Sequence, residues 1–260
     1  MERFASLSYH KLGLFALELS VILLAGSCSA KYDLRLEQEG SAQVSLSATL
    51  SPRTVALIAG LSAFAQGGAS STSASASLRA LDAASLSRNL KALNGISLVD
   101  LRNTSPNSVS GTFLITDPER ILSNAPLSGG KPVAEITSVF KVERSASGGR
   151  ISMDLSPVSA PAFLSALSPE IRDYLEALMA PIATGEKMDS ADYLALVALV
   201  YGPTIASELR TSVISVTLEL PSPAFTVQGG SSKGKQVDFS IPLVDLLTLY
   251  KPISLGASWK

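Results

Sequence analysis

Apolar and polar residues alternate in several short stretches near the start of this chain. Residues 32–36 and 44–50 place apolar side chains at every second position, with charged residues, Ser or Thr between them. Side chains alternate between the two faces of a strand, so both stretches predict strands with one buried face. The sequence Glu39-Gly40-Ser41 lies between them and predicts the turn of a β-hairpin.

The pattern changes between strand and helix further along the chain. Ser51 and Pro52 predict the start of a helix that runs to about Ala65, and residues 78–93 predict a second helix. From residue 160 to residue 211 the apolar positions recur with a helical period, and residues 242–249 predict one more short helix. Further strands are expected at 96–102, 109–116, 133–145, 150–155, 213–220, 224–228, 236–241 and 253–259.

Hairpins in series with helices grouped between them predict an α+β fold. We expect one twisted antiparallel sheet built from hairpins and covered by helices. The segment 160–211 is then a helical insertion between two portions of the sheet. A chain of 260 residues is near the size at which one domain is still reasonable, so residues 28–260 are interpreted as a single domain.

Two of the expected helices are apolar on nearly all sides. The first carries Val55, Ile58, Leu61 and Phe64, and the second carries Leu196, Val197 and Val200 within the uninterrupted apolar run 193–201. Helices of this kind are buried in a core, line an apolar cavity or contact a membrane. The sequence leaves these alternatives open, and the seven residues are the candidate contacts for an apolar ligand or a membrane.

Composition and charge favour a folded chain without a nucleic-acid partner. Apolar residues make up 46% of the chain and charged residues 17%, with a mean hydropathy of +0.31, which is outside the regime of disordered chains. The net charge is −1, and the densest basic group is Lys233-Gly234-Lys235 in a turn. Contacts with phosphates need clustered Lys and Arg, so we expect no nucleic-acid binding.

The N-terminus carries the most specific motif of the chain. Arg3 and Lys11 precede the apolar run Leu12–Ala25, and Cys28 follows it as the only cysteine. The run is too short for a membrane-spanning helix and fits the hydrophobic region of a cleaved signal peptide. The segment resembles a bacterial lipoprotein signal with a relaxed lipobox similar to those of spirochaetes. Glu18 in the apolar run, and Ala25 where leucine is usual, depart from the common pattern.

That resemblance implies processing and a location. Residues 1–27 would be removed as a signal peptide, and Cys28 would carry acyl chains such as palmitate that hold the protein on a membrane of the bacterial envelope. Ser29 takes the place of the aspartate that retains many lipoproteins in the inner membrane, which favours the outer membrane. Whether the protein faces the periplasm or the cell surface stays open.

A second resemblance concerns the expected fold. The hairpin at 32–50, the helix after it and the strand end Leu218-Glu219-Leu220-Pro221 are faintly similar to the LppM-like lipoproteins, which have a mixed α/β ectodomain. This resemblance covers about a third of the chain and implies a role in the envelope without naming one.

The residues that most enzymes use are scarce. The only histidine, His10, lies in the expected signal peptide, so a Ser-His-Asp or Cys-His arrangement and histidine-ligated zinc are excluded. Glu186, Asp189 and Asp192 lack the spacing of a calcium loop, and we expect them to cap the following helix. We therefore expect no enzyme activity, no metal and no cofactor.

Two functions remain compatible with the sequence. The first is a non-enzymatic lipoprotein that binds a lipid, another apolar ligand or the membrane surface. The second is an accessory or scaffold subunit of an envelope protein complex, which its lipid only tethers to the membrane.

Overall fold

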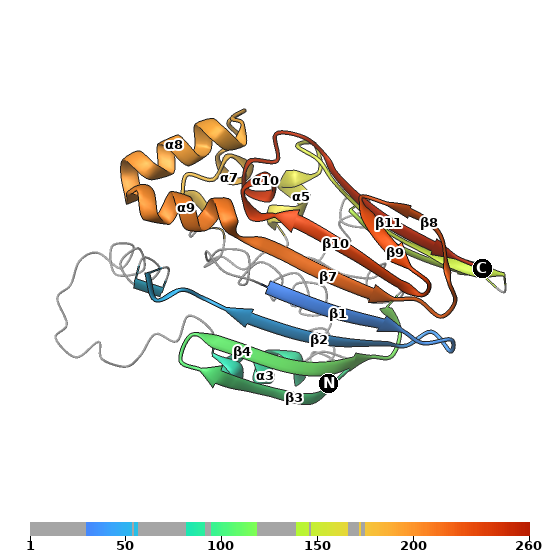
Figure 1. The fold of residues 1–260 in the computed structure, drawn as a ribbon. Coiled ribbons are helices and arrows are strands. Elements are labelled where there is room, and N and C mark those ends of the chain that lie inside the picture. Colours follow the sequence, from blue (N-terminus) through green and yellow to red (C-terminus); the bar gives the residue numbers. More distant parts are fainter. Residues whose placement is uncertain are drawn as a thin grey trace, which may run out of the picture.

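The α+β class expected from the sequence is confirmed by the fold. The computed structural model describes residues 30–53, 55–56, 82–91, 95–118, 139–145, 147–165, 172 and 175–260. Two β-sheets run through the molecule, and most of the helices gather at one end of them (Figure 1).

The larger sheet has seven strands in the order β3-β4-β2-β1-β7-β10-β9. Its strands are β1 (Ala30–Leu36), β2 (Ala42–Thr49), β3 (Ile96–Ser105), β4 (Ser108–Ile115), β7 (Val213–Glu219), β9 (Gly230–Lys233) and β10 (Gln236–Pro242). All neighbours in this sheet are antiparallel except β1 and β7, which run parallel with Ala30 opposite Ile214. The long connection between β1 and β7 permits this parallel pair.

A smaller sheet has four strands in the order β5-β6-β11-β8. Its strands are β5 (Phe140–Ser145), β6 (Gly148–Leu155), β8 (Ala224–Gln228) and β11 (Ile253–Trp259), and all pair antiparallel. The single sheet expected from the sequence is therefore two sheets. Alternation of apolar residues reports which side chains are buried and not which strands pair, so the sequence pattern could not separate the two.

The strand β9 is a second difference from the sequence prediction, which expected no strand between residues 228 and 236. Gly230 lies opposite Phe239 of β10, and a Cβ atom on Gly230 would lie 2.6 Å from the ring atom Cδ1 of Phe239. The absence of a side chain lets the backbone pair closely with β10. The turn expected at Lys233-Gly234-Lys235 is present, and Gly234 has a φ of +64°.

The helices of the segment 160–211 confirm the expected change of period. They are α5 (Ala160–Ser165), α7 (Pro181–Thr184), α8 (Ser190–Tyr201) and α9 (Pro203–Thr211), and the described part of this segment contains no strand. The short helix α10 (Leu243–Thr248) follows β10, as expected. Helix α3 (Ala83–Lys91) packs against β3 and is the described part of the helix expected at 78–93.

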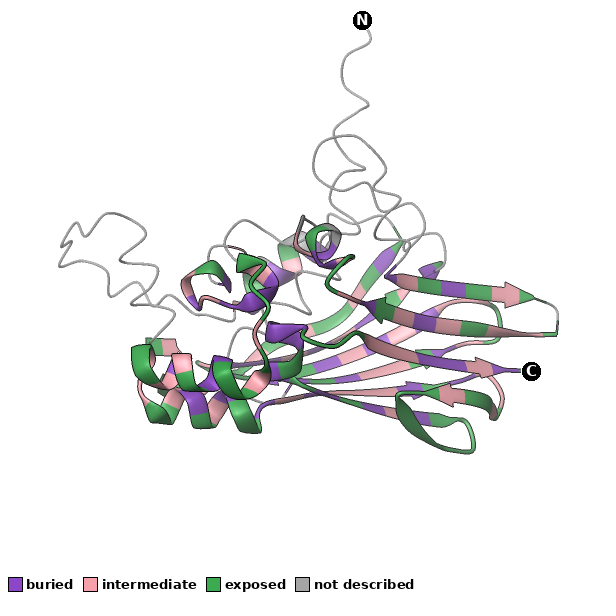
Figure 2. Cartoon of the chain, turned by 90° about the horizontal axis from the view of Figure 1, so that it is seen from above, coloured by how far each residue is buried: buried purple, intermediate pink, exposed green. Residues whose placement is uncertain are grey.

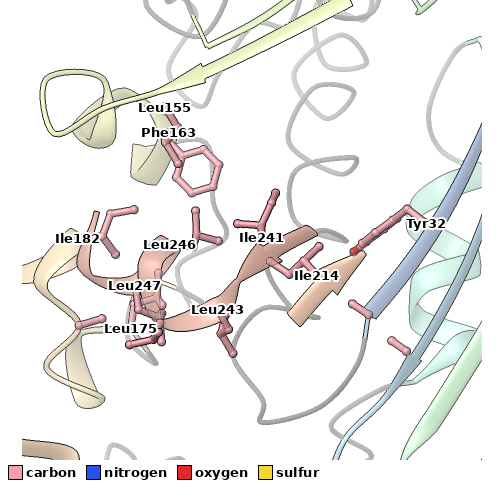
Figure 3. Packing of buried hydrophobic residues seen from close by; sticks show 14 of the residues in the cluster. Tyr32, Leu155, Phe163, Leu175, Ile182, Ile214, Ile241, Leu243, Leu246 and Leu247 are labelled. Atoms are coloured by element: carbon pink, nitrogen blue, oxygen red, sulfur yellow. The ribbon is translucent and has the colours of Figure 1, made fainter. Parts of the chain in front are cut away.

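Buried residues form two clusters that correspond to the two ends of the sheets. The larger cluster lies between the larger sheet and the helices, and in Figure 3 Leu243, Leu246 and Leu247 of α10 lie among these side chains. The smaller cluster lies where the two sheets face each other. It consists of Leu36, Ala42, Leu218, Leu220, Val237, Phe239, Ala257 and Trp259. Buried and exposed residues alternate along the strands, as the sequence pattern predicts (Figure 2).

Candidate functional site

Helices α8 and α9 form a corner that projects from one end of the molecule (Figure 1). Asp189 caps α8, because its carboxylate oxygen Oδ1 accepts hydrogen bonds from the backbone N–H groups of Ala191 and Asp192, each at 2.9 Å. The expected capping role of Asp189 is thereby confirmed. Gly202 separates the two helices with a φ of +90°, a conformation that favours glycine, and Pro203 begins α9.

The inner face of α8 belongs to the core. Tyr193, Leu194 and Val197 are buried, and the Tyr193 hydroxyl donates a hydrogen bond of 3.2 Å to the backbone carbonyl of Leu178. Tyr201 donates in the same way to the carbonyl of Ala177. Burial raises the pKa of the Tyr193 phenol, and the nearby Tyr201 raises it further. Both phenols therefore act as neutral hydrogen-bond donors that fix the helix in place.

The outer face of α8 is also apolar. Leu199 is 84% exposed and Val200 is 50% exposed, although large apolar side chains are usually covered. Further uncharged residues are exposed beside them, and no charged residue occurs between Asp192 and Glu208. We call this surface the apolar corner, and it consists of Ala195, Leu199, Val200, Pro203 and Thr204.

The structure divides the candidate residues of α8 between its two faces. Val197 is fully buried in the core, Leu196 is half-buried, and Val200 is exposed on the apolar corner. Leu199 is the most exposed large apolar residue of α8, and the sequence analysis did not single it out. Every position from Leu194 to Val200 is apolar, so the sequence contains no polar stripe that would mark the outward face.

The candidate residues of the earlier helix are only partly described. Val55 is half-buried and packs against the larger core cluster. Pro52, Arg53, Val55 and Ala56 are helical, which agrees with the expected start of this helix. Ile58, Leu61 and Phe64 lie outside the described residues, as does Cys28.

The apolar corner and the start of β1 lie at the same end of the molecule. Ala30 pairs with Ile214, which is three residues beyond the last residue of α9, Thr211. The end of β2 also meets α9, because the hydroxyl Oγ of Ser51 donates a hydrogen bond of 2.7 Å to the carboxylate oxygen Oε2 of Glu208. Helix α9 is therefore connected to the start of β7, which pairs with β1, and to the end of β2.

No helix in the described ranges has the length and apolar character needed to cross a membrane. Within the same ranges, no group of three or more His, Cys, Asp or Glu side chains is placed to hold a metal ion.

Comparison with known proteins adds one weak structural likeness. No protein-family model and no curated protein sequence matches this chain. Among solved structures, the fold is similar to the NMR structure of the folded domain of the Mycobacterium tuberculosis LppM protein. The identity is 6%, the TM-score is 0.38, and the match covers 90% of each chain. A match at this TM-score transfers neither a family nor a residue role to this chain.

Proposed function

We propose that this chain is a lipid-anchored, non-enzymatic protein of the bacterial envelope that rests on the membrane through its apolar corner. The observation that carries the proposal is the exposed pair Leu199 and Val200 at the end of the molecule where β1 begins. Cys28 is two residues before Ala30 in the sequence, and two residues of chain span at most about 7 Å. Acyl chains on Cys28 would hold the apolar corner against the bilayer.

The two contributions would add to one another. Full burial of a Leu or Val side chain is worth about 1.5 to 3 kcal/mol, and each buried methylene of an acyl chain adds about 0.8 kcal/mol. A single acyl chain binds a membrane only marginally, so a second apolar contact at the same end strengthens the attachment. The net charge of −1 supports an apolar contact instead of attraction to anionic lipids.

The arrangement of α8 favours membrane contact over an apolar ligand cavity. The inward residues Tyr193, Leu194 and Val197 are packed into the core, which leaves the outward residues for a partner. The outward residues lie on two helices that project from one end of the molecule (Figure 1), whereas small-molecule sites are concave. The outer membrane is the proposed location, because Ser29 follows Cys28.

A polarity-sensitive dye at position 199 tests the contact in the full lipidated chain. The acylated Cys28 has no free thiol, so the variant Leu199→Cys would supply the single reactive thiol. The emission of a dye at position 199 is compared between two samples: protein bound to phosphatidylcholine vesicles, and protein kept in solution without detergent by a cyclodextrin that binds its acyl chains. We expect the emission to shift to the blue in the vesicles. Val99→Cys is the matched control, because Val99 is 62% exposed on the edge strand β3.

The outcomes separate the proposed roles. Equal spectra at positions 199 and 99 in vesicles would contradict membrane contact by the apolar corner. A blue shift at position 199 that requires a co-purified protein, and that vesicles alone do not produce, would favour the role of an accessory subunit. The anchor itself is tested by intact-mass measurement of the native product, where we expect Cys28 to be acylated and residues 1–27 to be absent.

A further inference from the structure

A polar groove lies at the opposite end of the sheets from the apolar corner. Its volume is about 710 Å³, and it is formed where the β1–β2 turn, the end of β4, the β5–β6 turn and the end of β11 meet. All of its lining residues belong to the described part of the chain. They are Gln38, Glu39, Gly40, Thr116, Asp117, Arg144, Ser145, Ser147, Gly148, Pro221, Ser222, Trp259 and Lys260.

Arg144 lies in the groove, and the described residues leave most of its donors without an acceptor. Its guanidinium donates one hydrogen bond, from Nη2 to the backbone carbonyl of Glu37 at 3.2 Å, and lies 6.0 Å from the centre of the Trp259 ring. The Nε atom of Arg144 is buried and has no hydrogen-bond partner among the described residues. Because Nε is closed off from the groove, a ligand would bind the Nη donors, for which the described residues supply only the Glu37 carbonyl. Buried or half-buried donors are usually paired, so a ligand acceptor at these atoms would stabilise the arrangement.

The backbone beside Arg144 is shaped to receive its guanidinium. Gly40 has a φ of +109°, and a Cβ atom there would lie 3.1 Å from the Nη1 atom of Arg144. The glycine thus permits both the turn and the close approach of the cation. No Asp or Glu side chain of the described residues forms an ion pair with Arg144, although five ion pairs occur elsewhere in them.

The remaining polar groups indicate what else a ligand would carry. The hydroxyls of Ser145 and Ser222 already donate to the backbone carbonyls of Gly148 and Lys260, so their oxygens remain as acceptors. Glu39 and Asp117 add carboxylates, which also accept hydrogen bonds. Glu39 and Asp117 balance the charges of Arg144 and Lys260, so the groove has no excess of positive charge to attract a ligand with two or more negative charges. They favour a ligand whose hydroxyl groups donate hydrogen bonds, since an ionised carboxylate only accepts them.

We propose that the groove binds a small, hydroxyl-rich molecule with one negative charge, of the chemical class of the sugar acids. The carboxylate of the ligand would pair with the Arg144 guanidinium, which matches a carboxylate with two parallel N–H donors. The hydroxyls of the ligand would donate hydrogen bonds to Glu39 and to the hydroxyl oxygens of Ser145 and Ser222. This inference does not depend on membrane contact by the apolar corner.

The fluorescence of Trp259 provides a direct measurement, because Trp259 is the only tryptophan of the chain and lies beside Arg144. The full chain in a polyoxyethylene detergent, which contains no sugar, is titrated with glucuronate as the probe. We expect a saturable change in emission with glucuronate. Glucose supplies the hydroxyls without the charge, and acetate supplies the charge without the hydroxyls, so we expect at least tenfold weaker responses to both.

Variants test the assignment of Arg144. We expect Arg144→Gln to weaken glucuronate binding at least tenfold and Arg144→Lys to weaken it less, because lysine keeps the charge and loses the planar fork. Lys260→Gln removes a second cation near the groove, whose Nζ lies 3.6 Å from the centre of the Phe225 ring, and should weaken binding less than Arg144→Gln does. Arg150→Gln is the matched control, because Arg150 is an exposed residue of β6 outside the groove.

Three results would overturn the proposal. The first is the absence of a saturable response to glucuronate in the parent chain. The second is a response of equal affinity to acetate or to glucose. The third is unchanged glucuronate affinity in folded Arg144→Gln or, if that variant does not fold, unchanged affinity in both Arg144→Lys and Lys260→Gln.

Discussion

The two ends of the β-sheets differ in the segments that connect the strands. At one end β10 leads into α10, β6 is followed by α5, and β7 begins after α9. These helices close the core at this end, and α8 exposes Leu199 and Val200. At the other end the strands meet in short turns with glycine, serine and charged residues, and these turns enclose the polar groove. The strand β1 connects both ends over seven residues, which is about 20 Å.

This difference assigns the two ends to different surroundings. An exposed apolar surface is stabilised by contact with lipid or another apolar surface, whereas a polar groove is stabilised by water and polar solutes. If Cys28 carries the anchor, the apolar corner faces the membrane and the groove faces away from it. Substitutions at each end of the sheets test this difference.

The largest effect is expected when an aspartate on the buried face of α8 is compared with an aspartate on its exposed face. Val197→Asp places a carboxylate where the side chain is fully buried, and an unpaired buried charge costs several kcal/mol. We expect the free energy of unfolding to fall by about 4 kcal/mol or more. Leu199→Asp, two residues away on the exposed face, should change it by less than about 0.5 kcal/mol. Urea unfolding followed by circular dichroism measures both, and equal losses would contradict the division of α8 into a buried and an exposed face.

The sequence predicted local structure better than it predicted pairing or exposure. The helical segment 160–211 and the β-hairpin at 32–50 were predicted because periodicity and turn residues act over a few positions. The division into two sheets depends on contacts between strands far apart in the chain, such as Ile253 with Leu155. A single sequence contains no direct signal for such pairs.

The candidate sites show the same limit. The sequence indicated that α8 is a site of interest, and it could not separate buried Val197 from exposed Leu199 because both lie in an uninterrupted apolar run. The polar groove was not predicted. Arg144, Gly40 and Trp259 come from three distant parts of the chain, and only the fold brings them together.

At the groove end, Gly149→Ala tests the packing beneath Trp259. A Cβ atom on Gly149 would lie 2.4 Å from Cζ2 of Trp259 and 2.9 Å from the backbone oxygen of Glu143. Overpacking of this kind costs about 1 to 3 kcal/mol, and the displaced indole should change its fluorescence. Gly256→Ala on β11 is the control, because its nearest neighbour, the Ile151 oxygen, is 3.3 Å away, so we expect a smaller loss. Equal losses would show that Trp259 is not packed tightly on Gly149.

At the helical end, Tyr193→Phe removes one hydroxyl and leaves the ring. The buried carbonyl of Leu178 then lacks this donor, so we expect the free energy of unfolding to fall by about 1 kcal/mol. The raised pKa of Tyr193 means that the folded state holds the phenol proton more tightly than the unfolded state. The stabilisation is therefore complete below about pH 10, the pKa of a free phenol, and is lost as the pH rises further.

Comparison of the parent with Tyr193→Phe separates the titration of the Tyr193 phenol from that of other groups. The free energy of unfolding of the parent should fall more steeply above about pH 10 than that of Tyr193→Phe. Urea unfolding at a series of pH values measures the two slopes. Identical slopes would show that Tyr193 titrates as freely in the folded chain as in the unfolded one.

The smallest effect is expected at the contact between helix α9 and the residues that follow β2. Arg53 approaches Glu208 at 3.8 Å and its side chain is 68% exposed, so water and salt screen the pair. We expect Arg53→Ala to change the free energy of unfolding by less than about 0.5 kcal/mol. Ser51→Ala removes the 2.7 Å hydrogen bond to the same carboxylate and should cost about 1 kcal/mol. If Arg53→Ala proves more damaging than Ser51→Ala in 0.5 M NaCl, the ion pair and not the hydrogen bond attaches β2 to α9.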